Sequence, residues 1–505
     1  MLARARRPVA SLCLAALAFD VVGCHHVVQR EPGPGIPTKA DGSATTERVV
    51  GVTLADGREV HFDKGAPSTV VHDSLFSMVA GQPFGAPVRD VQRLWIEKID
   101  PVGTTLLVIG TGAALFAVAF AIALAAKESC PFVYSWDGTQ YVFDAEPYGG
   151  AITRGLERDD FGALEHLRPD SAGLYRLLVT NEVNETQYTN SMQLFVVDHW
   201  PGRRVEMDEF GRLHDVTTTF SPVSARDQDG RDLTSWLRAA DDLIWEPLPA
   251  ADPAGRVREE IVLTFPKPHG ATRARLVARV STGMWGSHMI REMLALRGSA
   301  VHDWYAAIDS SRAAQDSLRM WNIQEELYVL KLDVDEAGAW HPRALLPGGG
   351  PFIAETRVTP LDVSRATGDS LRLRIRPPSG FWALNSFAVS YDDETPPVAV
   401  DTLAPVSART RDGHDVLADI SHPDDRYYAM PTTTDRAIVT FRAPAPRPGT
   451  ERSIFLHTRG YYRLHLDERG TPALAELQRI ESQPDGAARL AAELYASRRV
   501  AGGSH

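Results

Sequence analysis

The sequence VGTTLLVIGTGAALFAVAFAIALAA, residues 102–126, divides the chain into a short amino-terminal part and a long carboxy-terminal part. Its twenty-five residues carry no charge, and about twenty apolar helical residues cross a hydrocarbon core of about 30 Å. The run therefore predicts a transmembrane helix. A helix buried in a protein core is an open alternative, because Ala, Gly and Thr are numerous.

A dinucleotide-binding loop is a third interpretation of the same run. Gly110 and Gly112 give the beginning of a GxGxxG pattern after an apolar strand-like stretch. Leu115 stands where the third small residue belongs, and no acidic residue follows at the required distance. The small residues instead favour close helix–helix approach, so the run also predicts homo-oligomers formed through the hydrophobic helix. Lys98 and Lys127 flank it almost symmetrically and give no orientation.

The first twenty-four residues have the features of a secretion signal. Three arginines precede an apolar stretch at residues 9–19, and the segment ends in VVGC at residues 21–24. This ending resembles the lipobox of bacterial lipoproteins, although Val stands where Leu is commonest and Asp20 lies just upstream. The resemblance implies that Cys24 carries diacylglycerol and a further acyl chain such as palmitate. The alternative is a plain signal peptide or an uncleaved anchor.

The two anchors conflict with each other. If Cys24 is acylated outside the inner membrane and residues 102–126 then cross it, residues 127–505 would be cytoplasmic. Few lipoproteins have this arrangement. The sequence therefore predicts a membrane-anchored protein of the bacterial cell envelope and leaves the choice between inner and outer membrane open.

Composition narrows the class of protein. The chain has three cysteines, and with Cys13 removed and Cys24 acylated only Cys130 remains, so neither an intramolecular disulfide nor a cysteine-based zinc framework is expected. Removing residues 1–23 deletes three Arg and one Asp and takes the net charge from −12 to −14. Nucleic-acid binding needs a concentrated basic face, so no nucleic-acid partner is expected. The 34 prolines and 39 glycines, spread among short apolar runs, favour β-structure.

These patterns predict a mainly β chain of several parts. We expect a lipoprotein signal peptide at 1–23, a disordered polar tether at 24–46, a small β-barrel-like domain at 47–100, the hydrophobic helix at 102–126, a β-rich domain at 128–285, a helical insertion at 286–322, a β-sandwich at 323–470 and carboxy-terminal helices at 471–505. In the helical insertion apolar residues recur every three or four positions, and Gly298 is expected to separate two helices.

Residues 47–100 predict a hairpin followed by further alternating strands. The strand pattern at 49–54 meets a second one at 58–62 through an Ala-Asp-Gly turn. The hairpin and a last strand containing Val91, Leu94 and Ile96 resemble the small SH3-like barrels behind the acylated cysteine of short bacterial lipoproteins. The resemblance implies a spacer or a docking surface.

The long carboxy-terminal part opens with a second Asp-Gly hairpin. The order CPFVYSWDG, NEVNETQY and LFVVDH, from residue 130 to residue 199, resembles a β-rich module of bacterial envelope proteins that also carry FG-GAP or TPR repeats. Further on, the strands around Trp382 and Tyr391 resemble galactose-binding-like jelly rolls, which bind sugars through aromatic side chains at loop ends. Because both aromatic residues lie inside strand patterns here, core packing is the favoured role.

Three groups of residues could be interpreted as sites. Glu182, Glu185, Asp198 and His199 could form a metal or acid–base site, but strand alternation places neighbours on opposite faces, which favours a structural role. Residues 227–232, DQDGRD, echo a calcium loop without its distal glutamate, so a solvated turn is expected. Ser370 lies in a GDSL motif and His422 in a later D-x-x-H, yet a strand rather than a helix follows the serine.

The expected function is therefore binding or scaffolding by a membrane-anchored, non-enzymatic β-region. Its partners would be membrane lipid and either a protein or a glycan, and no cofactor or metal is expected. Two alternatives stay open: a carbohydrate-active or esterase-like surface enzyme, and a component of an oligomeric membrane assembly.

Overall fold

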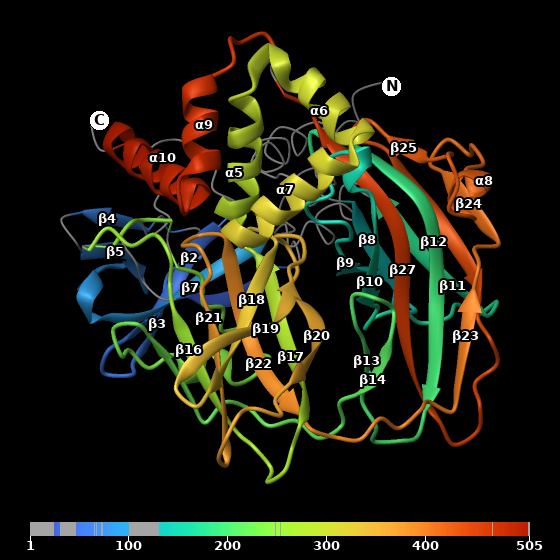
Figure 1. Ribbon diagram of the computed structural model, residues 1–505, viewed down its shortest axis with the longest axis horizontal. Helices are drawn as coiled ribbons and strands as arrows, with labels where there is room; N and C mark the ends of the chain where they lie inside the picture. Colours follow the sequence, from blue (N-terminus) through green and yellow to red (C-terminus); the bar gives the residue numbers. More distant parts are fainter. Residues whose placement is uncertain are drawn as a thin grey trace, which may run out of the picture. The chain divides into compact units, whose positions relative to one another are not determined.

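The computed structural model describes residues 25–30, 47–64, 66, 68–71, 74–99, 131–247, 249–252, 254–466 and 468–502. These residues belong to two compact units, one before and one after residue 127, and both are mainly β (Figure 1). Cys13, Cys24, Cys130 and the hydrophobic run at 102–126 lie outside the described residues. Among the helices that the structure describes, none combines the length and the apolar character needed to cross a bilayer.

The first unit contains two small antiparallel sheets. One has the strand order β1 (His25–Arg30), β7 (Val91–Ile99), β2 (Glu47–Leu54), β3 (Glu59–His61), and the other has the order β4 (Thr69–Val71), β5 (Ser74–Val79), β6 (Gln82–Pro87). A short 3-10 turn, η1 (Val88–Asp90), precedes β7. The buried residues are the alternating apolar positions of the strands, among them Val49, Val52, Leu75, Leu94 and Ile96.

The predicted Asp-Gly hairpin is confirmed. β2 pairs with β3 across a turn in which Gly57 has a φ of 84°, a conformation that glycine adopts without strain. The Asp56 carboxylate accepts a hydrogen bond of 3.0 Å from the backbone N–H of Arg58, which closes the turn. The local sequence alone therefore specifies this hairpin.

Two strands of the first unit differ from expectation. Residues 25–30, assigned to the polar tether, form β1 and pair with β7 from His25↔Ile99 to Arg30↔Leu94. Two adjacent valines and an unpaired edge of β7 favour this strand over a tether. β6 was also missed because it contains Pro83 and Pro87, but it is an edge strand, where proline is tolerated.

Within the second unit, two face-to-face pairs of sheets form two β-sandwiches, the second inserted in the first. Residues 132–199 and 399–464 build the first sandwich from a sheet of order β24-β26-β11-β8-β9 and a sheet of order β10-β27-β12-β23, with β25 on β12. Its strands are β8 (Phe132–Trp136), β9 (Tyr141–Ala145), β10 (Arg158–Ala163), β11 (Leu174–Thr180), β12 (Glu185–His199), β23 (Ala399–Leu403), β24 (Ser407–Thr410), β25 (Tyr428–Met430), β26 (Arg436–Arg442) and β27 (Glu451–Leu464).

The second sandwich comes from residues between β12 and β23. Its sheets have the orders β15-β16-β21-β18-β19 and β20-β17-β22. The strands are β15 (Ser224–Asp227), β16 (Ile261–Pro266), β17 (Arg273–Thr282), β18 (Val329–Glu336), β19 (Ala339–Pro347), β20 (Glu355–Asp362), β21 (Ser370–Ile375) and β22 (Trp382–Ser390). The chain therefore leaves the first sandwich once, builds the second and returns, so two linkers join them.

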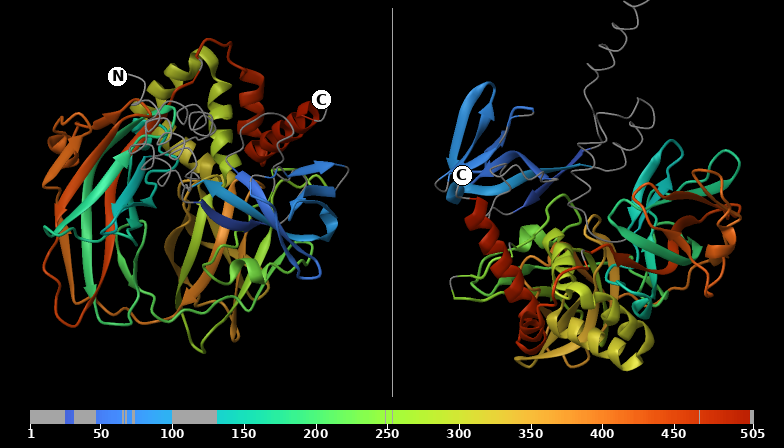
Figure 2. Two further views of the ribbon diagram at one scale, coloured as in Figure 1. Left: turned by 180° about the vertical axis from the view of Figure 1, so that it is seen from behind. Right: turned by 90° about the horizontal axis from the view of Figure 1, so that it is seen from above.

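Helices lie at one end of the second sandwich (Figures 1 and 2). They are α5 (Met284–Ala295), α6 (Val301–Ser310), α7 (Arg312–Glu325), α9 (Leu474–Ser482) and α10 (Gly486–Gly502). The 3-10 turn η3 (Gly298–Ala300) joins α5 to α6, and the 3-10 turn η2 (Arg154–Leu156) contacts α6 and α7. The short helices α4 (Thr234–Leu237) and α8 (Leu417–Ile420) belong to other parts of the chain. The helical stretch agrees with the sequence pattern. Gly298, with a φ of 48°, separates α5 from α6 as predicted. Met289, Ile480 and Leu490 complete the second core.

A hairpin of β13 (Val205–Met207) and β14 (Leu213–Asp215) forms a wedge between the sandwiches (Figure 1). On one face, Val205 and Met207 pack against Val197 and Phe455 of the first sandwich. Glu206 and His214 are directly paired and therefore share the opposite face. Beyond β14, Val216 packs against Val277 and Val358 of the second sandwich.

A buried ionic cluster also joins the two sandwiches. Arg357 of β20 contacts Glu355 of its own strand and Asp160 of β10, the latter at 3.4 Å, and all three are at most 9% exposed. Burial raises the pKa of Glu355, whereas the charges of Arg357 and Arg158 outweigh burial and lower the pKa of Asp160. Removing Arg357 would leave Glu355 buried without the cation it contacts, and Asp160 would keep its 3.3 Å ion pair with Arg158.

Candidate functional site

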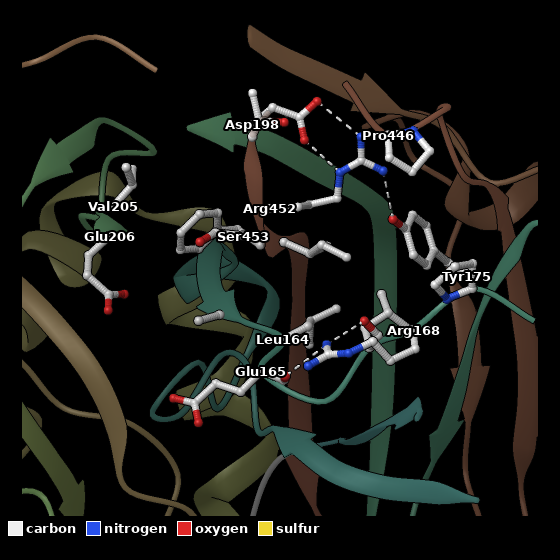
Figure 3. A pocket seen from close by; sticks show the side chains of 16 residues that line it. Leu164, Glu165, Arg168, Tyr175, Asp198, Val205, Glu206, Pro446, Arg452 and Ser453 are labelled. Atoms are coloured by element: carbon white, nitrogen blue, oxygen red, sulfur yellow. Dashed lines mark hydrogen bonds and ion pairs between the residues drawn. The ribbon is translucent and has the colours of Figure 1, made fainter. Parts of the chain in front are cut away.

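A pocket of about 480 Å³ lies where β10 ends and leaves the first residues of β27 uncovered (Figure 3). Ala163 is the last residue of β10 that pairs with β27, and the chain then turns away through residues 164–170. The pocket therefore wraps around the edge of β27. Residues from both faces of the sheet line it: Ala163, Leu164, Glu165, Leu167, Arg168, Pro169, Tyr175, Asp198, Val205, Glu206, Pro446, Thr450, Arg452, Ser453, Ile454 and Phe455.

One wall of the pocket is a buried ion pair. The Asp198 side chain is 1% exposed and accepts hydrogen bonds from Arg452 Nε at 2.7 Å and Nη2 at 3.1 Å. Arg447 Nη1 donates a third bond at 2.6 Å. Burial alone would raise the pKa of Asp198, but the hydrogen bonds from both arginines outweigh it and lower the pKa. The aspartate is therefore an anion held in place.

Arg452 is committed to the protein on every side. Besides Asp198, its guanidinium donates to Tyr175 Oη at 3.3 Å and to the carbonyl of Pro444 at 3.0 Å. The hydrogen bond to Asp198 is the main reason that its pKa is raised. Asp198 and Arg452 thus shape the wall rather than offering free groups to a ligand.

The groups that remain for a ligand are Glu165, Arg168 and Glu206. One carboxylate oxygen of Glu165 accepts a hydrogen bond of 3.2 Å from Arg279, and the Glu165 side chain is 52% exposed. One carboxylate oxygen of Glu206 accepts a hydrogen bond of 2.9 Å from Arg204, and burial raises the pKa of Glu206. Arg168 donates only to backbone carbonyls, and none of the described carboxylates forms an ion pair with it. Both signs of charge therefore reach the pocket rim.

Ser453 lines the pocket and contacts His199, which is not one of the lining residues. The two side chains lie on one face of neighbouring strands, with Ser453 Oγ 3.0 Å from His199 Nε2. His199 Nδ1 lies 3.2 Å from the carbonyl oxygen of Trp200. A carbonyl can only accept, so Nδ1 carries the proton and the lone pair of Nε2 faces the serine hydroxyl.

The predicted acidic group does not assemble into one site. Glu182 accepts from Tyr134 Oη at 2.5 Å and from Thr180, whereas Glu185 accepts from Gln187. Asp198 and His199 point away from each other, the first to its arginines and the second to Ser453. Within the described parts of the chain, no three His, Cys, Asp or Glu side chains are grouped as metal ligands. The four side chains therefore have separate partners and do not converge on one point.

The structure also places the calcium-loop-like stretch and the GDSL and D-x-x-H motifs. Asp227 accepts from the backbone N–H groups of Asp229 and Arg231, so the DQDGRD stretch is a solvated turn. Ser370 begins β21 of the second sandwich, and His422 follows α8 in the first. The GDSL and D-x-x-H motifs are therefore not brought together.

Most of the pocket could not be read from the sequence. Of its lining residues only Asp198 was considered beforehand, and its partner Arg452 lies 254 positions away. Arg168, Glu206 and Ser453 belong to no motif. The one available signal is that each of two charged residues stands next to an apolar strand pattern: Asp198 follows FVV, and Arg452 precedes SIF.

Comparisons with known proteins do not identify a family. No protein-family model matches the chain. No curated protein matches it either.

Solved structures give weak similarities only. They include a family 86 glycoside hydrolase in complex with neoagarooctaose, with 7% identity, a TM-score of 0.16 and coverage of 46% of this chain and 33% of that one. The GH31 α-xylosidase of Xanthomonas citri has 9% identity and a TM-score of 0.15, with coverage of 81% of this chain and 34% of that one. A triple jelly roll protein from the turret of an archaeal virus has 6% identity and a TM-score of 0.14, with coverage of 69% of this chain and 93% of that one. The chain spans about a third of the first two proteins.

Proposed function

We propose that the chain is a membrane-anchored bacterial envelope lipoprotein whose β-region is a non-enzymatic binding module, with the pocket beside β27 as its binding site. The observation that carries the binding role is the pocket itself. Its volume of about 480 Å³ lies in the range of small-ligand sites, and its lining combines apolar side chains such as Leu164 and Phe455 with the charged residues Glu165, Arg168 and Glu206.

The charges at the rim favour a neutral, hydroxyl-rich ligand, which we take to be a glycan segment. A strongly cationic ligand would meet Arg168, and a strongly anionic one would meet the two glutamates. Hydroxyl groups can both donate to a carboxylate and accept from a guanidinium. Each glutamate has only one of its oxygens in an ion pair with an arginine, so the other is available to a hydroxyl donor.

A glycan array with the purified full-length chain tests this proposal. The wild-type chain should retain a defined glycan, and Arg168→Gln and Glu206→Gln should each weaken the binding about tenfold or more, as expected for a lost hydrogen bond to a charged group. Glu260→Gln, a partly exposed acid of the second sandwich, is the matched control. Binding that survives both pocket variants, or a peptide ligand in place of a glycan, would overturn the assignment.

The contact between Ser453 and His199 favours a second candidate, an esterase-like surface enzyme. A serine hydroxyl within hydrogen-bond reach of an imidazole whose other nitrogen is held by a third group is the arrangement that nucleophilic catalysis requires. Here a backbone carbonyl holds the imidazole in place of a carboxylate. Hydrolysis of short O-acyl esters that is lost in Ser453→Ala and unchanged in Ser370→Ala would favour the enzyme over the binding module.

A further inference from the structure

His214 occupies an unusual position between two acids in the wedge hairpin. Its Nε2 lies 3.0 Å from Asp208 Oδ2, and its Nδ1 lies 2.9 Å from Glu394 Oε1. Asp208 belongs to the turn between β13 and β14, whereas Glu394 belongs to the linker that returns from the second sandwich. One imidazole therefore joins both linkers between the sandwiches.

Both carboxylates accept further hydrogen bonds in this arrangement. Asp208 accepts through its other oxygen from the backbone N–H groups of Phe210 and Arg212, each at 2.9 Å. Glu394 accepts from Arg275 at 2.8 Å, and its pKa is lowered because hydrogen bonds from His214 and Asp215 together with the Arg275 charge outweigh burial. An ionised carboxylate can only accept, so both ring nitrogens of His214 must donate. Only the imidazolium form has two N–H groups.

We infer that protonated His214 is a latch: its hydrogen bonds to Asp208 and Glu394 hold the two linkers together. The latch thereby fixes the position of β13, the strand that carries the pocket residue Glu206. Glu206 pairs directly with His214 across the hairpin, so loosening β14 loosens the strand that carries the pocket acid. When the imidazole loses its proton, one of the two carboxylates loses its donor. The latch is a regulation of the proposed binding site and in that respect rests on the proposed function.

The charged groups around the imidazole decide the direction of the effect. From its own hairpin come Asp208, Glu206 and Asp215, from the return linker Glu394 and Asp392, and from β17 Arg275. Arg203 pairs with Asp215 at 3.0 Å and Arg204 pairs with Glu206 at 2.9 Å. The acids in direct contact with the imidazole are therefore Asp208 and Glu394. The latch should therefore be closed between the pH range of carboxylates, about 4, and that of imidazoles, about 6.5, and should open as the pH rises further.

Hydrogen exchange followed by mass spectrometry tests the latch in the full-length chain. After correction for intrinsic exchange, amides of residues 204–216 and 391–398 should lose about tenfold or more of their protection between about pH 5.5 and pH 8, as expected for a charge-assisted hydrogen bond. In His214→Gln the same amides should be weakly protected at both pH values. A variant that keeps the wild-type pH dependence would overturn the inference, as would a wild type without one.

Two further variants complete the test. Glu394→Gln keeps the histidine and removes one acceptor charge, so it should reduce the pH dependence even if His214→Gln does not fold. His166→Gln removes a different histidine of the same unit, paired with Asp144, and should leave the pH dependence of the hairpin unchanged. Since hydrogen exchange needs no ligand, a failure to bind glycans would overturn the proposed function and leave the latch standing.

Discussion

Replacing Arg452 by methionine gives the sharpest test of the pocket wall. Asp198, 1% exposed, would lose two of its three charge-assisted hydrogen bonds and keep the one from Arg447. Removing one partner of a buried ion pair costs about 3–5 kcal/mol, and the remaining arginine reduces this to about 2–3 kcal/mol. A domain is stable by about 5–15 kcal/mol, so the loss would be a large fraction of the total.

The pH dependence of that loss has a definite sign. The pKa of Asp198 in the folded chain lies below its ordinary value of about 3.9, so its stabilisation is present above that value and is lost as the pH falls through the folded pKa. In Arg452→Met the pKa depression is smaller, and protonation at a higher pH relieves the buried charge. The difference in unfolding free energy between wild type and variant should be the same from pH 7 to about pH 5, and it should shrink below about pH 4, as the pH falls through the folded-state pKa of the variant and then of the wild type.

Urea unfolding followed by circular dichroism measures both effects. The control is Arg376→Met, which removes a half-exposed arginine whose contact with Glu260 is 3.7 Å long and should change the free energy of unfolding by about 0.5 kcal/mol at most. A loss for Arg452→Met no larger than that of the control would refute the reasoning. So would a loss that is as large at about pH 3 as it is at pH 7.

Three further changes have outcomes set by the structure. In Gly350→Ala the new Cβ would meet the Glu146 side chain at 2.0–2.4 Å, so the melting temperature should fall by several degrees, whereas Gly470→Ala, with no atom within 4 Å, should leave it unchanged. Arg357→Met should cost about 3–5 kcal/mol in urea unfolding because Glu355 and Asp160 stay buried; a change below about 0.5 kcal/mol would contradict the buried cluster. Gly298→Ala should destabilise the helices, since its Cβ would meet the Gly470 carbonyl oxygen at 2.2 Å, and an unchanged thermal melt would speak against this turn.

Local patterns in the sequence were reliable where the chain folds on itself nearby. The hairpins closed by Asp56-Gly57 and Asp137-Gly138 are confirmed, because the glycine conformation and the aspartate hydrogen bonds are set within a few residues. The apolar alternation also identified Trp382 as core. It is fully buried, and its indole donates to the carbonyl of Glu326 at 2.8 Å.

Features that depend on distant pairing could not be predicted. β12 and β27 are long continuous strands, but a bulge at residues 189–191 and buried polar residues interrupt the apolar alternation that would reveal such a strand. They pair from Glu185↔Leu464 to His199↔Glu451, and all residues of the second sandwich lie between them in the sequence. The pocket depends on this pairing, because it joins Asp198 to Arg452 and His199 to Ser453. Nothing in either local sequence indicates its partner.

The claim that this β-region works at a membrane surface depends on Cys24, and radiolabelled palmitate tests it most directly. Cells that produce the wild-type chain should incorporate the label into it, and Cys24→Ala should abolish the incorporation. The matched variant Cys13→Ala should keep the label, since residue 13 belongs to the segment expected to be removed. Label retained in Cys24→Ala, or absent from the wild type, would contradict the lipoprotein proposal.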